Sequence, residues 1–303
     1  MHDVLIIGAG PAGLTAGIYA SRSGLGALIL ESGAAGGQAA TAPFIENYPA
    51  LESIKGMELM EKMKKHCVNY CEIMEDEDVI NVKRAEESFI AESGNGIYEG
   101  RSVIIATGAR HRKLGVDGEE ELLGKGVSYC ATCDGFFFKG KDVVVIGGGN
   151  AAASDALYLS AVGARVKMVH RSSELRSDKV LQRRLDSRGI EILLDKKISA
   201  IKGKKKVQSV LLSDGTELKC DGVFVSVGID PSNELAQMLG AKVDKDGYIV
   251  TDGAQRTDIP FVYAAGDVVQ GMKQVVVACA QGAIAANSAY IDLKDPYWVQ
   301  AKK

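Results

Sequence analysis

Two segments of this 303-residue chain place an apolar strand, a glycine-rich turn and a helix in the same order. In the first segment these parts lie at 3–7, at Gly8-Ala9-Gly10-Pro11-Ala12-Gly13 and at 14–23. In the second they lie at 142–146, 147–152 and 153–162, and an apolar strand follows each helix. Near-continuous apolar strands are typical of parallel sheets that are covered on both faces. Both segments therefore predict βαβ units with a glycine turn between strand and helix.

The second unit begins about 140 residues after the first, which is a domain-sized interval rather than a solenoid repeat. A further buried strand at 261–267, followed by a helix-like run at 276–290, resumes the first domain. We predict an α/β fold with two Rossmann-like three-layer dinucleotide-binding domains, the second inserted into the first. The expected domains are 1–113 with 241–303, and 114–240.

The first glycine turn has the spacing that dinucleotide-binding sites require. Gly8 permits the tight turn, Gly10 lets the backbone approach a pyrophosphate, and Gly13 lets helix and strand pack closely. Glu31 ends the next strand, where a carboxylate accepts hydrogen bonds from a ribose diol. A turn without a ligand is the alternative. The pattern favours a flavin adenine dinucleotide (FAD) site.

The second turn lacks that carboxylate, because its second strand ends at Val169 and His170-Arg171 follows. Arg171 can pair with a 2′-phosphate, and Arg176 can add a second contact. The alternative is that these are solvated basic residues at a strand end. The pattern favours a nicotinamide dinucleotide site that prefers NADPH.

A Cys-x-x-Cys motif, Cys130-Ala131-Thr132-Cys133, lies shortly before the second turn and is followed by Asp134. In the first turn of a helix, residues three apart are neighbours, so the two sulfurs can bond. A helix N-terminus would also lower a thiol pKa. Asp134 can exchange protons with the dithiol, and the run 136–138 supplies an apolar floor.

Three other readings of the cysteines stay open. The motif can be half of a zinc site completed by His66, Cys67 and Cys71, although these ligands lie ~60 residues upstream and compact pairs are usual. It can also be two buried, inert cysteines. Cys67 and Cys71 can themselves form a redox pair, although i,i+4 spacing on a helix favours packing. We expect Cys220 and Cys279 in the core.

Composition argues against several other classes of protein. The net charge of −3 and the single basic cluster at 202–206 give no reason to expect nucleic acid or an anionic membrane. We expect no secretion signal, no membrane span and a cytoplasmic location. Six cysteines are too few for a disulfide scaffold, and we expect no bound metal. The acidic run 75–78 is interpreted as a solvated loop.

The chain resembles the low-molecular-weight thioredoxin reductases over essentially its whole length. The resemblance rests on Gly8-Ala9-Gly10-Pro11-Ala12-Gly13, Gly36-Gly37-Gln38, Glu46-Asn47-Tyr48-Pro49, Ala106-Thr107-Gly108, Cys130-Ala131-Thr132-Cys133-Asp134, Gly147-Gly148-Gly149-Asn150, His170-Arg171 and Ala265-Gly266-Asp267. It implies a homodimeric FAD enzyme that uses NADPH to reduce thioredoxin or a glutaredoxin-like protein. It also implies that Cys133 faces the flavin and that Cys130 attacks the partner's disulfide.

The resemblance also implies two sets of cofactor-binding residues. The FAD set is Gly8, Gly10, Pro11, Ala12, Gly13, Glu31, Gly36, Gly37, Gln38, Asn47, Thr107, Gly108, Gly266, Asp267, Lys273, Gln274 and Val275. The nicotinamide set is Gly147, Gly149, Asn150, Ala151, Ala152, His170, Arg171 and Arg176.

The chain departs from the family pattern at the second site. Ser154-Asp155 stands where the family has two glutamates, and Ser172 stands where it has a second arginine. Losing one phosphate contact would weaken NADPH discrimination by ~1–3 kcal/mol. NADH or a reduced deazaflavin therefore stays open as the donor. A dithiol oxidase that passes electrons to oxygen is a further alternative, which the retained His170, Arg171 and Arg176 disfavour.

Overall fold

The apolar run at the N-terminus forms β1 (His2–Ile7), which lies inside a seven-stranded sheet and pairs in parallel on both sides. The computed structural model describes residues 1–42 and 44–294. The sheet runs β3-β2-β1-β6-β5-β4, and β17 also pairs with β6. Its other strands are β2 (Ala27–Leu30), β3 (Glu72–Met74), β4 (Val79–Arg84), β5 (Phe89–Ser93), β6 (Ile97–Ile105) and β17 (Val262–Ala264).

Alternate side chains of these strands point to opposite faces of the sheet, and both faces are apolar. Other elements therefore cover the sheet on each side. Val4, Ile6 and Ile104 pack on one face with the helices α1 (Pro11–Arg22), α2 (Gly56–Cys67) and α7 (Val275–Lys294). Leu5 and Ile105 pack on the other face, together with the short helix α6 (Glu234–Met238) and the β4–β5 hairpin. The 3₁₀ helix η1 (Gly37–Thr41) precedes α2.

A second sheet of five parallel strands, in the order β11-β10-β9-β15-β8, is built on β9 (Asp142–Ile146). The other strands are β8 (Val127–Ser128), β10 (Arg165–Val169), β11 (Glu191–Leu193) and β15 (Gly222–Val225). One face packs on α4 (Asn150–Ala161) and α5 (Lys179–Ser187). The other packs on an antiparallel sheet of β12 (Ile198–Lys202), β13 (Ser209–Leu212) and β14 (Glu217–Lys219). The small helices α3 (Ala131–Asp134) and η2 (Gly135–Phe138) follow β8.

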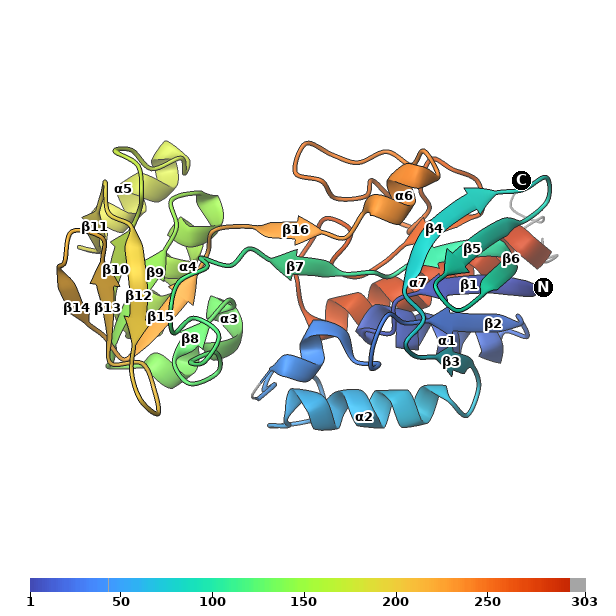
Figure 1. Ribbon diagram of the computed structural model, residues 1–303, viewed down its shortest axis with the longest axis horizontal. Coiled ribbons are helices and arrows are strands. Elements are labelled where there is room, and N and C mark those ends of the chain that lie inside the picture. Colours follow the sequence, from blue (N-terminus) through green and yellow to red (C-terminus); the bar gives the residue numbers. More distant parts are fainter. Residues whose placement is uncertain (43, 295–303) are drawn as a thin grey trace. The chain divides into compact units, whose positions relative to one another are not determined.

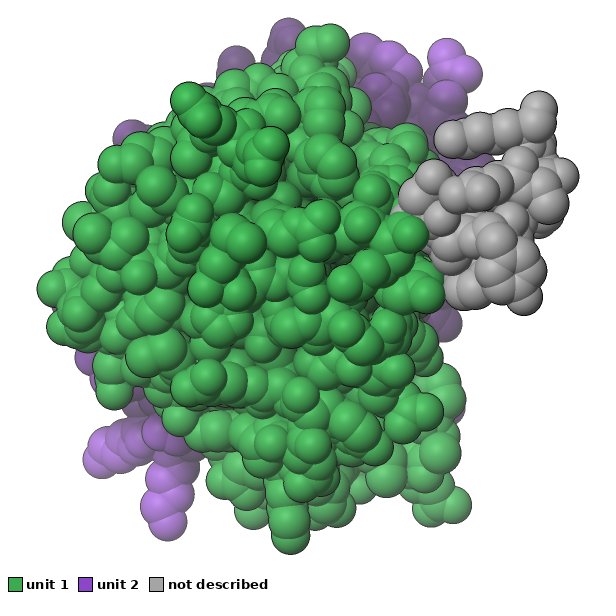
Figure 2. Space-filling view, turned by 90° about the vertical axis from the view of Figure 1, so that its right-hand side faces the viewer, with its two compact units in different colours: residues 1–110, 230–303 green, residues 111–229 purple. Residues whose placement is uncertain are grey.

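The chain divides into two compact units, Met1–Arg110 with Asp230–Lys303, and His111–Ile229 (Figure 2). The two crossings between them, β7 (Ala109–His111) and β16 (Ile229–Pro231), pair with each other as a two-stranded ribbon (Figure 1). The predicted fold class is confirmed: two Rossmann-like layered units, the second inserted into the first.

The second crossing lies earlier than the sequence suggests. Residues 230–240 are expected in the inserted domain, but Leu235 and Ala236 of α6 pack in the core of unit 1 beside Val79 and Val82. No change of composition marks this boundary, because the sequence of a surface helix does not indicate which of the two domains the helix packs on. The expected first domain also includes residues 295–303, which lie outside the described part of the chain.

Within the described residues, α7 is the one helix long and apolar enough, by length and composition, to cross a membrane. It is nevertheless a packing helix of unit 1, since Ala278, Ala285, Ala286 and Ala289 belong to the core that contains α1. Its backbone lies close to α1, because a Cβ on Gly282 would come within 2.1 Å of the Ala12 carbonyl oxygen. The helix therefore helps to support the first glycine turn.

Candidate active site

The first glycine turn packs tightly against neighbouring backbone at Gly8 and Gly13 but has open space at Gly10. Gly8 has a φ of +105°, and a Cβ there would lie 2.4 Å from the Ala106 carbonyl oxygen. A Cβ on Gly13 would lie 1.8 Å from the Gly8 carbonyl oxygen. A Cβ on Gly10, in contrast, would have no atom of the described residues within 4 Å. A backbone cradle of this kind, at the start of the 12-residue helix α1, fits a pyrophosphate.

Segments far apart in the sequence meet at this turn. The Gly36 amide donates a hydrogen bond to the Ala9 carbonyl at 2.9 Å. A Cβ on Gly37 would lie 3.2 Å from Cα of Gly10, and one on Gly266 would lie 2.9 Å from Cβ of Ala12. The structure therefore brings together three of the segments that the sequence proposed for the first site.

Glu31 follows β2 directly and lies beside the same turn. Its carboxylate accepts a hydrogen bond from the Ala9 amide at 2.5 Å and a longer one from the Gly33 amide at 3.3 Å. These contacts fix the carboxylate while leaving part of its acceptor capacity free. A ribose diol is the partner expected at this position.

Glu75 also supports the first site, although the sequence placed it in a solvated loop. Its carboxylate accepts a hydrogen bond from the Ala35 amide at 2.7 Å and pairs with Lys64 at 2.5 Å. The hydrogen bond from Ala35, followed by that from Lys64, lowers the pKa of Glu75. Glu75 thus fastens the loop that carries Gly36, and only the paired strands β2 and β3 bring it there.

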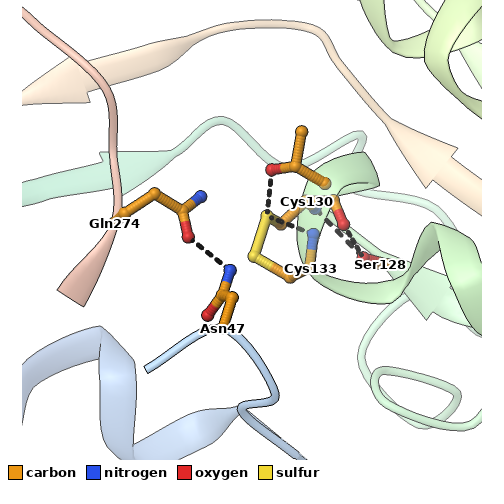
Figure 3. Close-up of a disulfide and its surroundings, with 6 residues drawn as sticks. Asn47, Ser128, Cys130, Cys133 and Gln274 are labelled. Atoms are coloured by element: carbon orange, nitrogen blue, oxygen red, sulfur yellow. Dashed lines mark hydrogen bonds between the residues drawn. A yellow bond between two sulfur atoms is a disulfide. The ribbon is translucent and has the colours of Figure 1, made fainter. Parts of the chain in front are cut away.

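Several of the remaining residues proposed for FAD lie just before α7 or contact that segment. Asn47 Nδ2 donates a hydrogen bond to Gln274 Oε1 at 2.8 Å (Figure 3). Lys273 Nζ donates to the backbone carbonyls of Asp267 and Val269 at 3.0 and 2.5 Å. Burial raises the pKa of the Asp267 carboxyl group. Thr107, before Gly108, donates its hydroxyl to the Ser232 carbonyl.

The second glycine turn, in unit 2, has a corresponding form. A Cβ on Gly147 would lie 2.3 Å from the Ser226 carbonyl oxygen, whereas Gly149 has no described atom within 4 Å of such a Cβ. The Arg176 amide donates to the Gly148 carbonyl at 2.8 Å. Asn150 and Asp178 exchange two hydrogen bonds, at 3.0 and 2.8 Å. These bonds hold the loop bearing Arg176 on the turn, beside Ala151 and Ala152 of α4.

The three proposed nucleotide contacts after β10 differ in exposure. Arg171 and Arg176 are exposed, and so is Ser172. His170 is buried under the turn, where a Cβ on Gly148 would collide with its ring. Its Nε2 has no hydrogen-bond partner among the residues that the structure describes. An orphaned ring nitrogen beside an open backbone turn fits a polar ligand group.

The departure from the family pattern on α4 has a local structural role. Asp155 accepts a hydrogen bond from the Ser226 hydroxyl at 2.5 Å, and burial raises the pKa of its carboxyl group. Ser154 is exposed. The acid at 155 therefore ties α4 to the end of β15, next to the glycine turn.

Cys130 and Cys133 are joined by a disulfide with an S–S distance of 2.04 Å. Cys130 is the N-cap of α3, and its sulfur accepts a hydrogen bond from the Cys133 amide at 3.2 Å. The Thr132 hydroxyl lies 3.4 Å from the same sulfur. The expected placement of the pair on a first helical turn is thus observed. The bonded pair is the arrangement of a redox disulfide.

Ser128 supports this disulfide, and sequence reasoning missed it. Its Oγ accepts a hydrogen bond from the Cys130 amide at 3.0 Å (Figure 3). Burial raises the pKa of Asp134, and a hydrogen bond with Ser128 partly offsets that rise. A serine two residues before a helix N-cap was the available signal.

The three phenylalanines after Asp134 do not form the single apolar floor that we expected. Phe138 is buried and packs edge-on against Phe224, with ring centroids 5.2 Å apart. Phe136 and Phe137 are exposed, at 66% and 40% of their surface. The 3₁₀ turn of η2 directs successive residues to different sides, so only one of the three reaches the core.

The other four cysteines are free thiols. Cys67, Cys71 and Cys220 are buried, and Cys279 is half-buried. Cys67 and Cys71 belong to unit 1, whereas the disulfide belongs to unit 2. Among the described residues no three histidine, cysteine or acidic side chains cluster as a metal site.

Comparison with known protein families gives one match that spans most of the chain. The family model for pyridine nucleotide-disulphide oxidoreductases matches residues 2–282.

Individual relatives match over nearly their whole length. The thioredoxin reductase of Treponema pallidum (strain Nichols) is 45% identical over 301 residues, which cover 96% of this chain and 97% of that protein. That of Bacillus subtilis (strain 168) is 42% identical, covering 95% and 93%. Among solved structures, thioredoxin reductase from Streptococcus pyogenes MGAS5005 superposes with a TM-score of 0.92 at 39% identity, covering 98% and 99% of the two chains.

Proposed function

Because the chain belongs to the pyridine nucleotide-disulphide oxidoreductase family, we propose that it is a thioredoxin-disulfide reductase. It takes electrons from NADPH and passes them through FAD and the Cys130–Cys133 pair to thioredoxin or a glutaredoxin-like protein. The observation that carries this proposal is the Cys130–Cys133 disulfide followed directly by a half-buried acid, Asp134. FAD, when bound, accepts a hydride from a nicotinamide and delivers two electrons to a disulfide.

Unit 1 is the proposed FAD-binding unit. The open backbone at Gly10 receives the pyrophosphate at the N-terminus of α1, and the fixed carboxylate of Glu31 receives the ribose diol. Gly36, Gly37 and Gln38, together with the Asn47–Gln274 pair, border the flavin half. Lys273 is pinned by two carbonyls and stiffens this border.

Unit 2 is the proposed nicotinamide-binding unit. Gly149 supplies the open backbone for the pyrophosphate, and Arg171 and Arg176 supply cations for a 2′-phosphate. The orphaned Nε2 of His170 is a third polar group at the turn. Ser172 stands where the family pattern has a second arginine, so this set has one cation fewer. NADH or a reduced deazaflavin is therefore the alternative donor.

The two cysteines have different roles in the proposed reaction. The Cys130 sulfur accepts a hydrogen bond from the Cys133 amide, and this bond stabilises negative charge on Cys130 once the pair is reduced. The Cys130 thiolate attacks the partner's disulfide, and the departing sulfur takes up a proton, for which Asp134 is the nearest acid in sequence. The Cys133 thiolate then attacks Cys130, which releases the partner as a dithiol and restores the Cys130–Cys133 bond.

A protein partner also needs a surface on which to dock. Phe136 is exposed in η2, three residues after Cys133, and offers an apolar contact there. Phe137, the next residue, is also exposed, and adjoining exposed apolar surface marks interaction sites. This favours a protein disulfide over a small one as the substrate.

The proposed enzyme is cytoplasmic and homodimeric. Unit 1 exposes large apolar side chains that a second copy can cover, among them Tyr19, Met57, Ile80 and Ile97. Sedimentation of the purified flavoprotein tests the dimer directly.

One anaerobic experiment tests the donor. The oxidised flavoprotein is mixed with NADPH, NADH or a reduced deazaflavin, and bleaching of the flavin band is followed. Rapid bleaching by NADPH supports the proposal. Rapid bleaching by only one of the other two donors would assign the enzyme that donor, and slow bleaching by all three would contradict a nicotinamide-linked reductase.

A further inference from the structure

Cys67 and Cys71 of unit 1 lie side by side although neither has a part in the proposed reaction. Cys67 is the last residue of α2, and the Cys71 amide donates to the Cys67 carbonyl at 2.9 Å, which completes one further turn. Both sulfurs lie 3.2 Å from the point that a Cβ on Gly17 of α1 would occupy. The missing side chain of Gly17 therefore leaves one small space that the two sulfurs share.

Their surroundings give the two thiols different reactivity. A hydrogen bond from Cys67, and a further one from the Ser21 hydroxyl, lower the pKa of Cys71 in spite of its burial. The same bond to Cys71, together with burial, raises the pKa of Cys67. Cys71 is thus the more readily ionised thiol of the two, while Cys67 keeps its proton beside it.

The pair is covered by a thin surface turn. Cys67 and Cys71 are 0% and 3% exposed, whereas Val68 and Tyr70 between them are exposed. Tyr70 is held by Arg22 of α1, whose Nη1 donates to the Tyr70 hydroxyl at 3.2 Å. The Tyr70 ring also contacts His66, and Arg22 lies over it, so the side-chain contacts that hold the turn all lie at the surface. A turn at the end of a helix that is held by exposed contacts opens more readily than the core beneath it.

We propose that Cys67 and Cys71 form a second oxidisable dithiol, in which Cys71 reacts with a peroxide and Cys67 then closes a disulfide. This proposal does not rest on the proposed function, because it concerns thiols of unit 1 alone. A small neutral peroxide reaches the pair when the 68–70 turn opens.

The two steps balance. The Cys71 thiolate attacks one oxygen of hydrogen peroxide, the O–O bond breaks, and the other oxygen leaves as hydroxide, which is protonated to water. The Cys67 sulfur then attacks the Cys71 sulfenic acid, the S–O bond breaks, and a second water leaves. Two thiols have lost two electrons and two protons, and the peroxide has been reduced to two waters.

A single tryptic peptide, residues 66–83, contains both cysteines, so alkylation and mass spectrometry can test this. The fully reduced holoprotein is exposed to hydrogen peroxide until Cys130–Cys133 has reoxidised. The protein is denatured and its free thiols are blocked with ordinary iodoacetamide, the light label. Disulfides are then reduced, and the released thiols are labelled with isotopically heavy iodoacetamide. We expect two heavy labels on peptide 66–83 and light label on Cys220, a lone buried thiol whose pKa burial raises to about 12.

Two variants separate the roles of the cysteines. Cys67→Ser should leave Cys71 as a sulfenic acid that a dimedone probe traps, and Cys71→Ser should leave Cys67 in the reduced form. Arg22→Ala should speed disulfide formation by about two- to fivefold, as expected for the loss of one exposed contact.

Three results would overturn the proposal. The first is two light labels on peptide 66–83 after Cys130–Cys133 has reoxidised. The second is irreversible oxidation of either cysteine without a disulfide in the wild-type protein. The third is a heavy label on Cys67 or Cys71 that comes from a disulfide with a cysteine outside this pair.

Discussion

The side-chain oxygen of Ser128 accepts a hydrogen bond from the Cys130 amide at 3.0 Å, so the last residue of β8 holds the first cysteine of the redox pair. The same serine hydrogen-bonds the Asp134 carboxylate and lowers its pKa against the opposing effect of burial. One hydroxyl group therefore connects the disulfide to its neighbouring acid.

Ser128→Ala should raise the pKa of Asp134 further, because burial then acts unopposed. If protonated Asp134 supplies the proton in partner reduction, activity falls as the pH rises through this pKa. The fall should therefore move to higher pH in the variant. The pH dependence of thioredoxin reduction checks this, with Ser128→Thr as the control that keeps the hydroxyl. An identical pH profile in Ser128→Ala and wild type would contradict the link.

Two glycine variants should separate binding of FAD from folding. Gly10→Ala has open space and an ordinary φ of −72°, so the apoprotein should keep its melting temperature but bind FAD at least about tenfold more weakly, because the methyl group enters the pyrophosphate cradle. Gly13→Ala should destabilise the apoprotein itself, since its Cβ would collide with the Gly8 carbonyl. Flavin fluorescence and thermal unfolding measure the two effects. Gly94→Ala, also in open space, is the matched control.

Ser172→Arg should strengthen the use of NADPH. An added guanidinium beside Arg171 can pair with the 2′-phosphate, and an exposed charge-assisted contact is worth roughly a tenfold decrease in KM. The KM for NADH should not change. Ser173→Arg adds the same charge one residue further on, and an equal gain in both variants would show a general charge effect rather than a specific contact.

Phe136→Ala should weaken docking of the protein partner. The exposed ring at 136 offers large apolar area three residues after Cys133, and loss of such a contact typically raises KM about tenfold. Flavin reduction by the nicotinamide donor should be unchanged. Met238→Ala, which truncates an exposed apolar residue of α6 in unit 1, is the control. Equal KM values for wild type and Phe136→Ala would remove this residue from the docking surface.

The glycine turns and the redox motif were predictable from the sequence because each is a local pattern. Strand, turn and helix follow one another within some thirty residues, and the spacing of Cys130 and Cys133 already specifies a helical turn. The insertion of one unit into the other was also predictable, because a strand–helix pattern resumes near the C-terminus.

Features that depend on packing were not predictable in this way. Glu75 looked like part of a solvated acidic loop, but parallel pairing of β2 and β3 places it against the Ala35 amide. The side of η2 on which Phe136 and Phe138 lie is likewise set by which ring meets Phe224. Periodicity does not record such contacts between segments that are distant in sequence.

In the proposed reaction, Cys133 is required to pass electrons from the flavin to a partner disulfide. The most direct measurement of this requirement compares wild type and Cys133→Ser in two assays, anaerobic flavin reduction by NADPH and NADPH-dependent reduction of thioredoxin. We predict that the variant keeps rapid flavin reduction but loses thioredoxin turnover. Thioredoxin turnover that survives in Cys133→Ser would contradict the proposed role of the disulfide.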